Sequence, residues 1–430
     1  MLSRSRYMTR TFSSALTTFK ARLGLRTADT VLPDATEPVK QQLLARPEEC
    51  LSIPVPDRSA DDLACQAAHE RGLFLARQDR WQELAKEIRD ADSNRLTTPG
   101  GMPVAELLAF GARHDVIQSV EHALADGCRN GDAALTAGIN GLEAVLNDMQ
   151  GDPYITMVLA LAHIDVGWAW RGTGWDTIVP KLNRNRCAAH FDRACQLLTP
   201  FCGLEMDSPL VASTRCAVMA GQRDPGTRIA DYYEDLIDLA PQNHRHMRAL
   251  GNHMLPRWFG SYDELELEAR RTAARTQDIW GAGGYTWVYF DAIAIDDTAC
   301  ARVDVDFFLD GLRDIVEVRP NQEMVNLLAA FCAVALRNGL GLNEQADLAR
   351  MQIIDAANWL IREHLTELHP MIWAHAADGF DNNARVTSAS RFAARGRADA
   401  LQVIADQFRE EISDGLRVIF TPNGTKTRPI

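Results

Sequence analysis

The chain has 430 residues, of which 46% are hydrophobic and 24% are charged, and this composition is typical of a globular protein rather than a disordered one. Its formal net charge of −13 at pH 7 disfavours nucleic acid as a partner, because binding to phosphate needs a concentrated basic surface. The most apolar long stretch, residues 154–170, carries His163 and Asp165 and is shorter than a bilayer span, so we expect no membrane span.

Basic residues gather at the N-terminus. Those that precede the first acidic residue of the chain are Arg4, Arg6, Arg10, Lys20, Arg22 and Arg26. Leu16, Phe19 and Leu23 lie at helical spacing in the same stretch, which is typical of an organellar targeting peptide or a membrane-surface helix. A loose terminus, or translation that starts at Met8, explains the same pattern. We expect residues 1–57 to form a flexible basic arm and lead-in.

The cysteine and arginine content points to a compartment and a source. Nine cysteines are scattered without a Cys-x-x-Cys pair, which favours reduced thiols in the cytoplasm over a disulfide framework. Arginine supplies most of the positive charge, and GC-rich bacterial codon usage explains this better than selection for arginine contacts. We therefore expect a cytoplasmic, bacterial protein.

From about residue 59 onward the apolar residues follow a helical period, and no run alternates as a strand does. N-cap residues, followed by an acidic residue three positions later or by proline, predict where helices begin. The predicted starts are Ser59 with Asp62, Asp152 before Pro153, Asp224 before Pro225, and Ser261 with Glu264. Residues 58–150 are expected to form N-terminal helical repeats.

Segments that end in proline recur with a period near 40 residues. Pro200 and Pro241 are separated by 241 − 200 = 41 residues, and Pro320 follows after 320 − 241 = 79, which is close to two such units. Periods of this length are typical of solenoids built from helix pairs. We expect residues 151–376 to form a repeat core, with a further boundary at the glycine-rich break near residue 280.

A finer register within this core resembles a tetratricopeptide repeat. Tyr233 lies eight residues before Pro241, and the Leu-Gly pair that ends at Gly251 begins nine residues after that proline, as in such repeats. Met247 and Met254 stand where a Trp and a Tyr are usual, so the match is partial.

The same register occurs near the N-terminus. Gly72 and Trp81 are nine residues apart, which matches the small residue of a first helix and the aromatic residue that opens a second. A small residue lets two helices approach closely while larger neighbours fill the space around it. The predicted fold class is all-α, an α-solenoid of stacked antiparallel helix pairs that is tetratricopeptide-like.

An enlarged turn interrupts the repeat at HMLPRWFGSYDEL, residues 253–265. Pro256 is expected to end the first helix of the pair, and Phe259 to fill the seam between the two helices. Arg257 and Trp258 are harder to bury without a partner, so we expect them to line a binding surface.

The repeat core also resembles a known family. The stretches that carry the resemblance are GWAWRGTGW at 167–175, DLAPQNHRHMRALGNHMLPRWFGSYDELELEARRTA at 238–273 and GGYTWVYF at 283–290. They resemble a bacterial domain-of-unknown-function family with tetratricopeptide-like helices and a Pro-Arg-Trp corner, over roughly residues 150–300. The resemblance implies the helical fold and supplies no reaction.

The C-terminal region, residues 377–430, differs from the repeats. Residues 377–390 read as a loop, and the apolar residues that follow at steps of three and four predict one long amphipathic helix. These residues are Leu401, Ile404, Phe408, Ile412, Leu416 and Ile419. We expect the helix to cap the last apolar face of the array, and the alternative is a homodimer formed through it.

Signatures of common catalytic sites are absent from the sequence, which has no P-loop, no Gly-x-Ser-x-Gly elbow and no His-Glu-x-x-His zinc helix. We therefore expect no cofactor, no metal and no catalytic residue. His246 and His253, with His244 nearby, suggest a shared metal or anionic ligand, although buried or groove-lining histidines explain the spacing more simply. Acidic residues that suggest magnesium ligands, or more simply a solvated helix face, are Asp231, Glu234, Asp235, Asp296 and Asp297.

A further group of aromatic and arginine side chains suggests a binding surface, because tryptophan and arginine dominate binding hot spots. The set is Trp168, Trp170, Arg171, Trp175, Arg257, Trp258, Trp287 and Tyr289. Residues of this type at helical spacing are more often part of the core. The residues that we expect to contact a partner are Arg257, Trp258, His246, His253, Trp168, Trp170, Arg171, Trp287 and Tyr289.

These patterns favour a protein-interaction module, a helical-repeat scaffold that binds a peptide or protein in a concave groove. The alternatives are an all-helical enzyme with a cavity of carboxylates and histidines, and a structural homo-oligomer subunit. A binding module predicts a continuous aromatic and arginine surface without buried ionisable clusters, whereas an enzyme predicts three or more titratable side chains in one pocket. The sequence favours the first and leaves enzymatic activity open.

Overall fold

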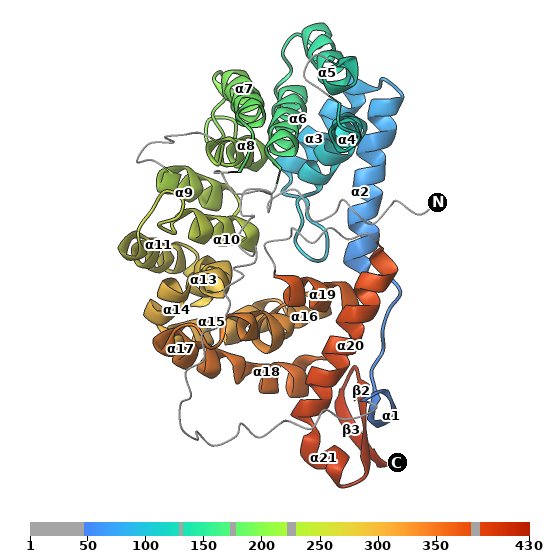
Figure 1. The fold of residues 1–430 in the computed structure, drawn as a ribbon, viewed down its shortest axis with the longest axis vertical. Helices are drawn as coiled ribbons and strands as arrows, with labels where there is room; N and C mark the ends of the chain where they lie inside the picture. The colour runs from blue at the N-terminus through green and yellow to red at the C-terminus, as the bar shows by residue number, and fades with distance from the viewer. Residues whose placement is uncertain (1–46, 129–131, 173–177, 222–228, 380–387) are drawn as a thin grey trace, which may run out of the picture.

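The structure is a computed structural model that describes residues 47–128, 132–172, 178–221, 229–379 and 388–430. Over these residues the chain is predominantly helical, which confirms the predicted helical class (Figure 1). No helix in these ranges is long and apolar enough to cross a membrane.

The elements follow one another along the chain with short connections. The first are α1 (Pro47–Cys50), β1 (Leu51–Ser52), α2 (Ala60–Arg77), α3 (Trp81–Ser93), α4 (Val104–Ala125), η1 (Ala133–Leu135), α5 (Ala137–Asp148), α6 (Pro153–Arg171), α7 (Lys181–Leu198) and α8 (Pro209–Met219). Next come α9 (Ile229–Leu239), α10 (His244–His253), α11 (Tyr262–Arg275), α12 (Gln277–Trp280), α13 (Gly283–Ile295), α14 (Asp297–Arg302), α15 (Val305–Val318) and α16 (Gln322–Ala330). The last are η2 (Phe331–Ala335), η3 (Leu336–Gly339), α17 (Glu344–Ile354), α18 (Ala356–Trp359), η4 (Leu360–His364), α19 (Pro370–Asp378), α20 (Ala389–Gln407), α21 (Arg409–Ser413), β2 (Leu416–Thr421) and β3 (Gly424–Pro429).

Side-chain caps fix several helix starts. The Ser59 hydroxyl accepts a hydrogen bond from the Asp62 backbone N–H at 3.1 Å, and the Asp62 carboxylate accepts one from the Ser59 N–H at 3.1 Å. Asp152 caps α6 and Ser261 caps α11, in each case by accepting hydrogen bonds from backbone N–H groups of the first turn. These predicted starts are confirmed, while the one at Asp224 lies outside the described residues.

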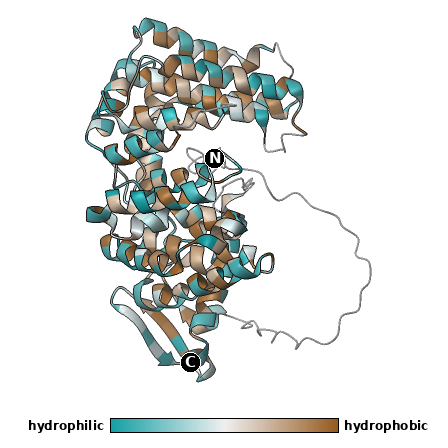
Figure 2. Ribbon diagram, turned by 90° about the vertical axis from the view of Figure 1, so that its left-hand side faces the viewer, coloured by the Kyte–Doolittle hydropathy of each residue, from teal (hydrophilic) through white to brown (hydrophobic). Residues whose placement is uncertain are grey.

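Helices close in sequence pack on one another. In the N-terminal part α2 packs on α4, and α4 and α7 pack on α6; further along, α10 packs on α13, α13 on α15, and α19 on α20. Figure 1 shows that the helices follow a curved path from α2 to α20, which lies beside the segment that contains α1. Hydrophobic and hydrophilic residues alternate around most helices, as expected where one helix face is covered (Figure 2).

Glycines allow close helix approaches, and two of them were predicted to do so. A Cβ at Gly251 would overlap the backbone carbonyl oxygen of Val288, so α10 and α13 come together at this position. A Cβ at Gly72 would overlap the carbonyl oxygen of Leu108 on α4. The prediction placed each glycine against the other helix of its own pair, whereas Gly72 of α2 meets α4 and Gly251 of α10 meets α13.

The C-terminal region corrects the prediction of one long helix. Helix α20 ends at Gln407, α21 is short, and β2 and β3 form an antiparallel hairpin. Gly415, with φ of 75°, ends the helical part in a conformation that favours glycine. Val418 and Phe420 then point into the core while their neighbours do not, which is the two-residue period of a strand.

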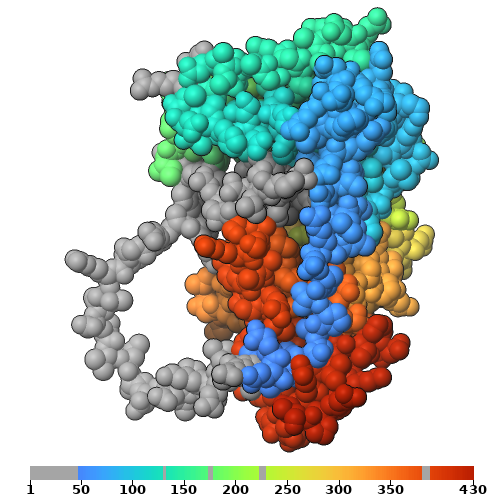
Figure 3. Space-filling model, turned by 90° about the vertical axis from the view of Figure 1, so that its right-hand side faces the viewer, coloured from blue at the N-terminus to red at the C-terminus, as the bar shows by residue number. Residues whose placement is uncertain are grey.

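The N-terminal lead-in packs against this hairpin. Strand β1 pairs with β2 in parallel, with Leu51 opposite Val418, and the Leu368 N–H donates to the Pro54 carbonyl at 2.8 Å. Figure 3 shows this N-terminal segment against the C-terminal elements. The predicted flexible arm is therefore wrong for its described part, residues 47–57.

Helix α20 does not present its apolar face to a partner. Leu401 and Ile404 are buried, and the helix packs on α19 of the same chain. The face that was expected to support a homodimer is thus covered within the chain.

Candidate functional site

The candidate site is the turn between α10 and α11, which we call the corner (residues 254–260). Its backbone is fixed by hydrogen bonds from the Trp258 N–H to the Leu255 carbonyl at 2.9 Å and from the Phe259 N–H to the His253 carbonyl at 3.2 Å. Gly260 closes the turn, because a Cβ there would overlap the Met254 backbone.

The corner places its side chains at different depths. Pro256 and Arg257 are exposed, whereas Trp258 and Phe259 are half-buried. Phe259 packs against the main core, as predicted for a residue that fills the seam. The Trp258 ring meets the ring of buried His253 edge-on, with centroids 5.8 Å apart. Arg257 and part of Trp258 are therefore accessible next to each other.

His253 is a neutral support for this surface. Its Nδ1 lies 2.7 Å from the Tyr233 hydroxyl, and burial lowers the pKa of the imidazole to about 4. A neutral imidazole offers no positive charge to an anion. His253 therefore contacts the Trp258 and Phe259 rings as an uncharged group at pH 7.

His246 lies at the other end of α10, in the interior. Its Nε2 lies 2.9 Å from the Asn243 amide nitrogen, and burial, reinforced by the charge of Arg245, lowers its pKa to about 3. Both histidines are on α10 as predicted, but they are core groups. The described residues contain no set of three or more His, Cys, Asp and Glu placed to hold a metal ion.

The predicted aromatic residues of α13 are buried. Trp287 is 0% exposed and stacks on His244 with ring centroids 4.3 Å apart. Tyr289 is 1% exposed and donates from its hydroxyl to the Glu266 carboxylate at 2.9 Å. The prediction that Trp287 and Tyr289 line a binding surface is therefore wrong, because α13 is enclosed by α10, α11 and α15.

The α6 residues lie in another place. Trp170 is buried; Trp168 is half-buried and packs edge-on against Phe191 of α7 at 5.3 Å. Arg171 sits over the Trp168 ring at 5.8 Å, and Trp175 lies outside the described residues. Trp168 and Arg171 thus remain partly accessible, while the set as a whole is divided between the α6–α7 and α10–α13 contacts.

The acidic residues that suggested magnesium ligands have structural partners. Glu234 pairs with Arg275 at 3.0 Å, and Asp297 pairs with Arg350 at 2.6 Å. Asp296 caps α14. Three of the five carboxylates therefore take part in ion pairs or in a helix cap.

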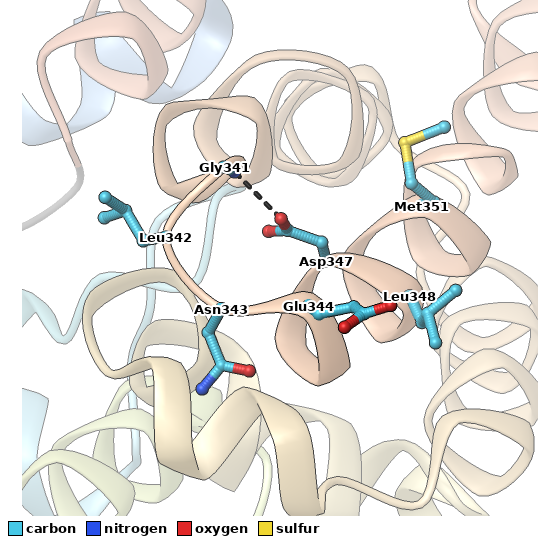
Figure 4. Close-up of a pocket in the computed structure, with 7 residues that line it drawn as sticks. All are labelled: Gly341, Leu342, Asn343, Glu344, Asp347, Leu348 and Met351. Carbon is cyan, nitrogen blue, oxygen red and sulfur yellow. Dashed lines mark hydrogen bonds between the residues drawn. The ribbon is translucent and has the colours of Figure 1, made fainter. Parts of the chain in front are cut away.

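A shallow depression lies elsewhere, on α17 and the loop before it (Figure 4). Leu342, Leu348 and Met351 line it and are 76%, 65% and 51% exposed, and the Gly341 N–H donates to the Asp347 carboxylate at 2.9 Å. None of the residues predicted to bind a partner lines this depression.

Buried polar atoms that lack a hydrogen-bond partner among the described residues gather around α10, a feature that the sequence did not indicate. They include His244 Nδ1, Arg245 Nε, Asn252 Oδ1, His253 Nε2, Trp258 Nε1 and Trp287 Nε1. Such atoms are rare in protein interiors and mark places where a ligand, a water molecule or a movement supplies the partner. The run HRHMR at 244–248, which concentrates polar groups on one helix, is the sequence feature that could have indicated these buried atoms.

Comparison of the chain with protein-family models, with curated proteins and with solved structures gave no significant match.

Proposed function

We propose that the chain is a helical-repeat binding protein, an α-solenoid of antiparallel helix pairs in a tetratricopeptide-like register that binds a protein or peptide partner. Two observations support the repeat. Helices close in sequence pack on one another along a curved path, and Gly251, where the register expects a small residue, is a point of helix contact.

The observation that carries the binding role is the accessibility of Arg257 beside Trp258 at the corner. Tryptophan and arginine contribute most to binding energy where a partner covers them. The Trp258 indole N–H is buried and has no acceptor among the described residues, so a partner that shifts the ring and provides a carbonyl gains a hydrogen bond. The backbone bonds of the corner hold both side chains on a fixed support.

The test is affinity capture from the native cell with three forms of the chain. These are the wild type, Arg257→Ala/Trp258→Ala, and the matched control Arg337→Ala/Leu348→Ala, which removes an exposed arginine and an exposed apolar residue elsewhere. We expect a partner that the wild type and the control retain and the corner variant loses.

Purified partner then gives the affinity. We expect the corner variant to bind at least about tenfold more weakly, the loss of one hot-spot side chain. Arg257→Ala alone keeps the proposal testable if the double variant is unstable, since Arg257 is exposed. Capture of the same proteins by all forms would contradict the proposed function.

A further inference from the structure

The depression on α17 has an apolar centre that lies open to solvent (Figure 4). Leu342, Leu348 and Met351 line it, and each is more than half exposed. Leu348 and Met351 are three residues apart, so they share one face of α17. Large apolar side chains that are exposed beside one another, rather than singly, mark a surface that another segment covers.

Acidic side chains border this apolar centre. Glu344 and Asp347 line the same depression, and the exposed Asp355 directly follows α17. Arg350, the arginine of α17, is 1% exposed and lies 2.6 Å from Asp297, so it places no positive charge on this surface. Positions 344, 348, 351 and 355 recur at steps of four and three, which is one helix face. We call this surface the α17 stripe, and it consists of Leu342, Glu344, Leu348, Met351 and Asp355.

The N-terminal region of the chain carries the complementary pattern in its sequence, although it lies outside the described residues. Three apolar residues recur there at steps of three and four, as on one face of a helix. Lys20 and Arg26 accompany them, and no acidic residue occurs before position 29. Residues 16–26 also match residues 344–355 of the stripe in length. The three apolar residues are Leu16, Phe19 and Leu23.

The chain between this segment and the described residues is long enough to reach α17. Residues 27–46 number 20 and extend up to about 70 Å at roughly 3.5 Å per residue. A compact chain of 430 residues has a radius of gyration of about 22 Å. Helix α1, where the described chain begins, packs on β2; its partner strand β3 packs on η4, and η4 follows α17 and α18. The two regions are therefore only a few elements apart.

We propose that residues 16–26 bind the α17 stripe of the same chain. Leu16, Phe19 and Leu23 then cover the apolar side chains of the stripe and remove apolar surface from water. Lys20 and Arg26 lie beside the carboxylates at its ends, so the charges are complementary. The connection through residues 27–46 raises the effective concentration of the segment at the stripe. This contact does not depend on the corner or on its partner.

Photo-crosslinking in the purified full-length chain tests the contact. A photo-crosslinking amino acid replaces Phe19, and in a second protein it replaces Thr18, which helical spacing places away from the three apolar residues. Mass spectrometry locates the adducts. We expect position 19 to react with residues 342–355 of the same chain at a yield that does not depend on protein concentration, and position 18 to react there less.

Variants of the stripe test the apolar contact. Leu348→Ser/Met351→Ser is expected to lower the yield from position 19 at least about fourfold, the effect of losing one buried methylene group. The matched control is Leu63→Ser/Leu267→Ser, at leucines that are 53% and 47% exposed in α2 and α11, and we expect it to give the wild-type yield. The melting temperature of each variant shows that it is folded.

A charge exchange tests the polar contact. Glu344→Lys/Asp355→Lys is expected to lower the yield, because it places positive charges opposite the basic segment. Lys20→Glu/Arg26→Glu in the same chain is expected to restore it. This exchange carries the test alone if Leu348→Ser/Met351→Ser does not fold.

Three outcomes would overturn the proposal. They are no adduct with residues 342–355 from position 19, an adduct there that joins two chains, and a yield that neither the serine variant nor the charge exchange changes. An adduct between two chains would assign the stripe to a second copy instead. Arg257→Ala/Trp258→Ala is expected to keep the wild-type adduct, so failure at the corner and failure at the stripe are distinguishable.

Discussion

Glu106 is a buried carboxyl group whose pKa the fold raises. Its folded pKa of about 8 lies above the ordinary value of 4.5, so the unfolded chain ionises first and the stability of the fold decreases as pH rises from about 4.5 to 8. We predict that Glu106→Gln gains stability relative to wild type over this range. Urea unfolding at pH 5 and pH 8 measures the change, and the exposed Glu344→Gln serves as the control. An equal difference at both pH values would contradict the assignment.

His369 also has a raised pKa, but hydrogen bonds to carboxylates raise it rather than burial. Its Nδ1 lies 2.8 Å from Glu323 and its Nε2 lies 2.9 Å from Glu367. Burial lowers the pKa of His369, but these two hydrogen bonds outweigh burial and raise it above 6.5. The stability it contributes is complete below about pH 6.5 and is lost as pH rises through the folded pKa.

We therefore predict that His369→Gln destabilises the chain at pH 6 by about 1.5 to 3 kcal/mol, the range for hydrogen bonds to charged groups, and by less at pH 9. Thermal unfolding at the two pH values provides the measurement. The same loss at both would show that charge on His369 is not involved.

At the scale of elements, the contact of α10 with α13 depends on Gly251. We predict that Gly251→Ala destabilises the chain by about 1 to 3 kcal/mol, because the added Cβ overlaps the Val288 carbonyl oxygen and the two helices must move apart. Gly141→Ala is the matched control, since Gly141 lies in α5 with no atom within 4 Å of the added Cβ. It is expected to stabilise α5 by up to about 1 kcal/mol. Calorimetry of both variants decides, and equal effects would contradict the close approach.

The C-terminal hairpin shows where local patterns fail. Leu416 and Ile419 are three residues apart and continue the helical series, whereas Val418 and Phe420 fit a strand, and a short run satisfies both periods. The partner decides between them, because β2 pairs with β1 through Leu51, a residue at the other end of the described chain. A sequence pattern holds no information about that pairing.

At the scale of the whole molecule, the sequence predicted what local chemistry determines. Caps such as Ser59 and Ser261 are set by neighbours in sequence, and the structure confirms them. The approach of the N-terminal lead-in to the C-terminal hairpin was not predicted. It depends on contacts such as Leu368 with Pro54, which no periodicity encodes.

The candidate site was predicted only in part, because burial of its residues depends on contacts between helices. Spacing placed His246 and His253 on one helix, but burial of that helix against α13 removes them from any surface. The expected aromatic surface is reduced to the corner and to Trp168 with Arg171. Buried polar atoms of α10 that lack a hydrogen-bond partner among the described residues, such as Asn252 Oδ1 and His253 Nε2, were not predicted.

The most direct measurement of the binding role is covalent capture from the corner itself. A photo-crosslinking amino acid at position 257 is compared in living cells with the same amino acid at position 337, an exposed arginine elsewhere on the chain. Our account predicts one reproducible protein adduct from position 257 that position 337 does not give. Identical adducts from both positions, or none from position 257, would contradict it.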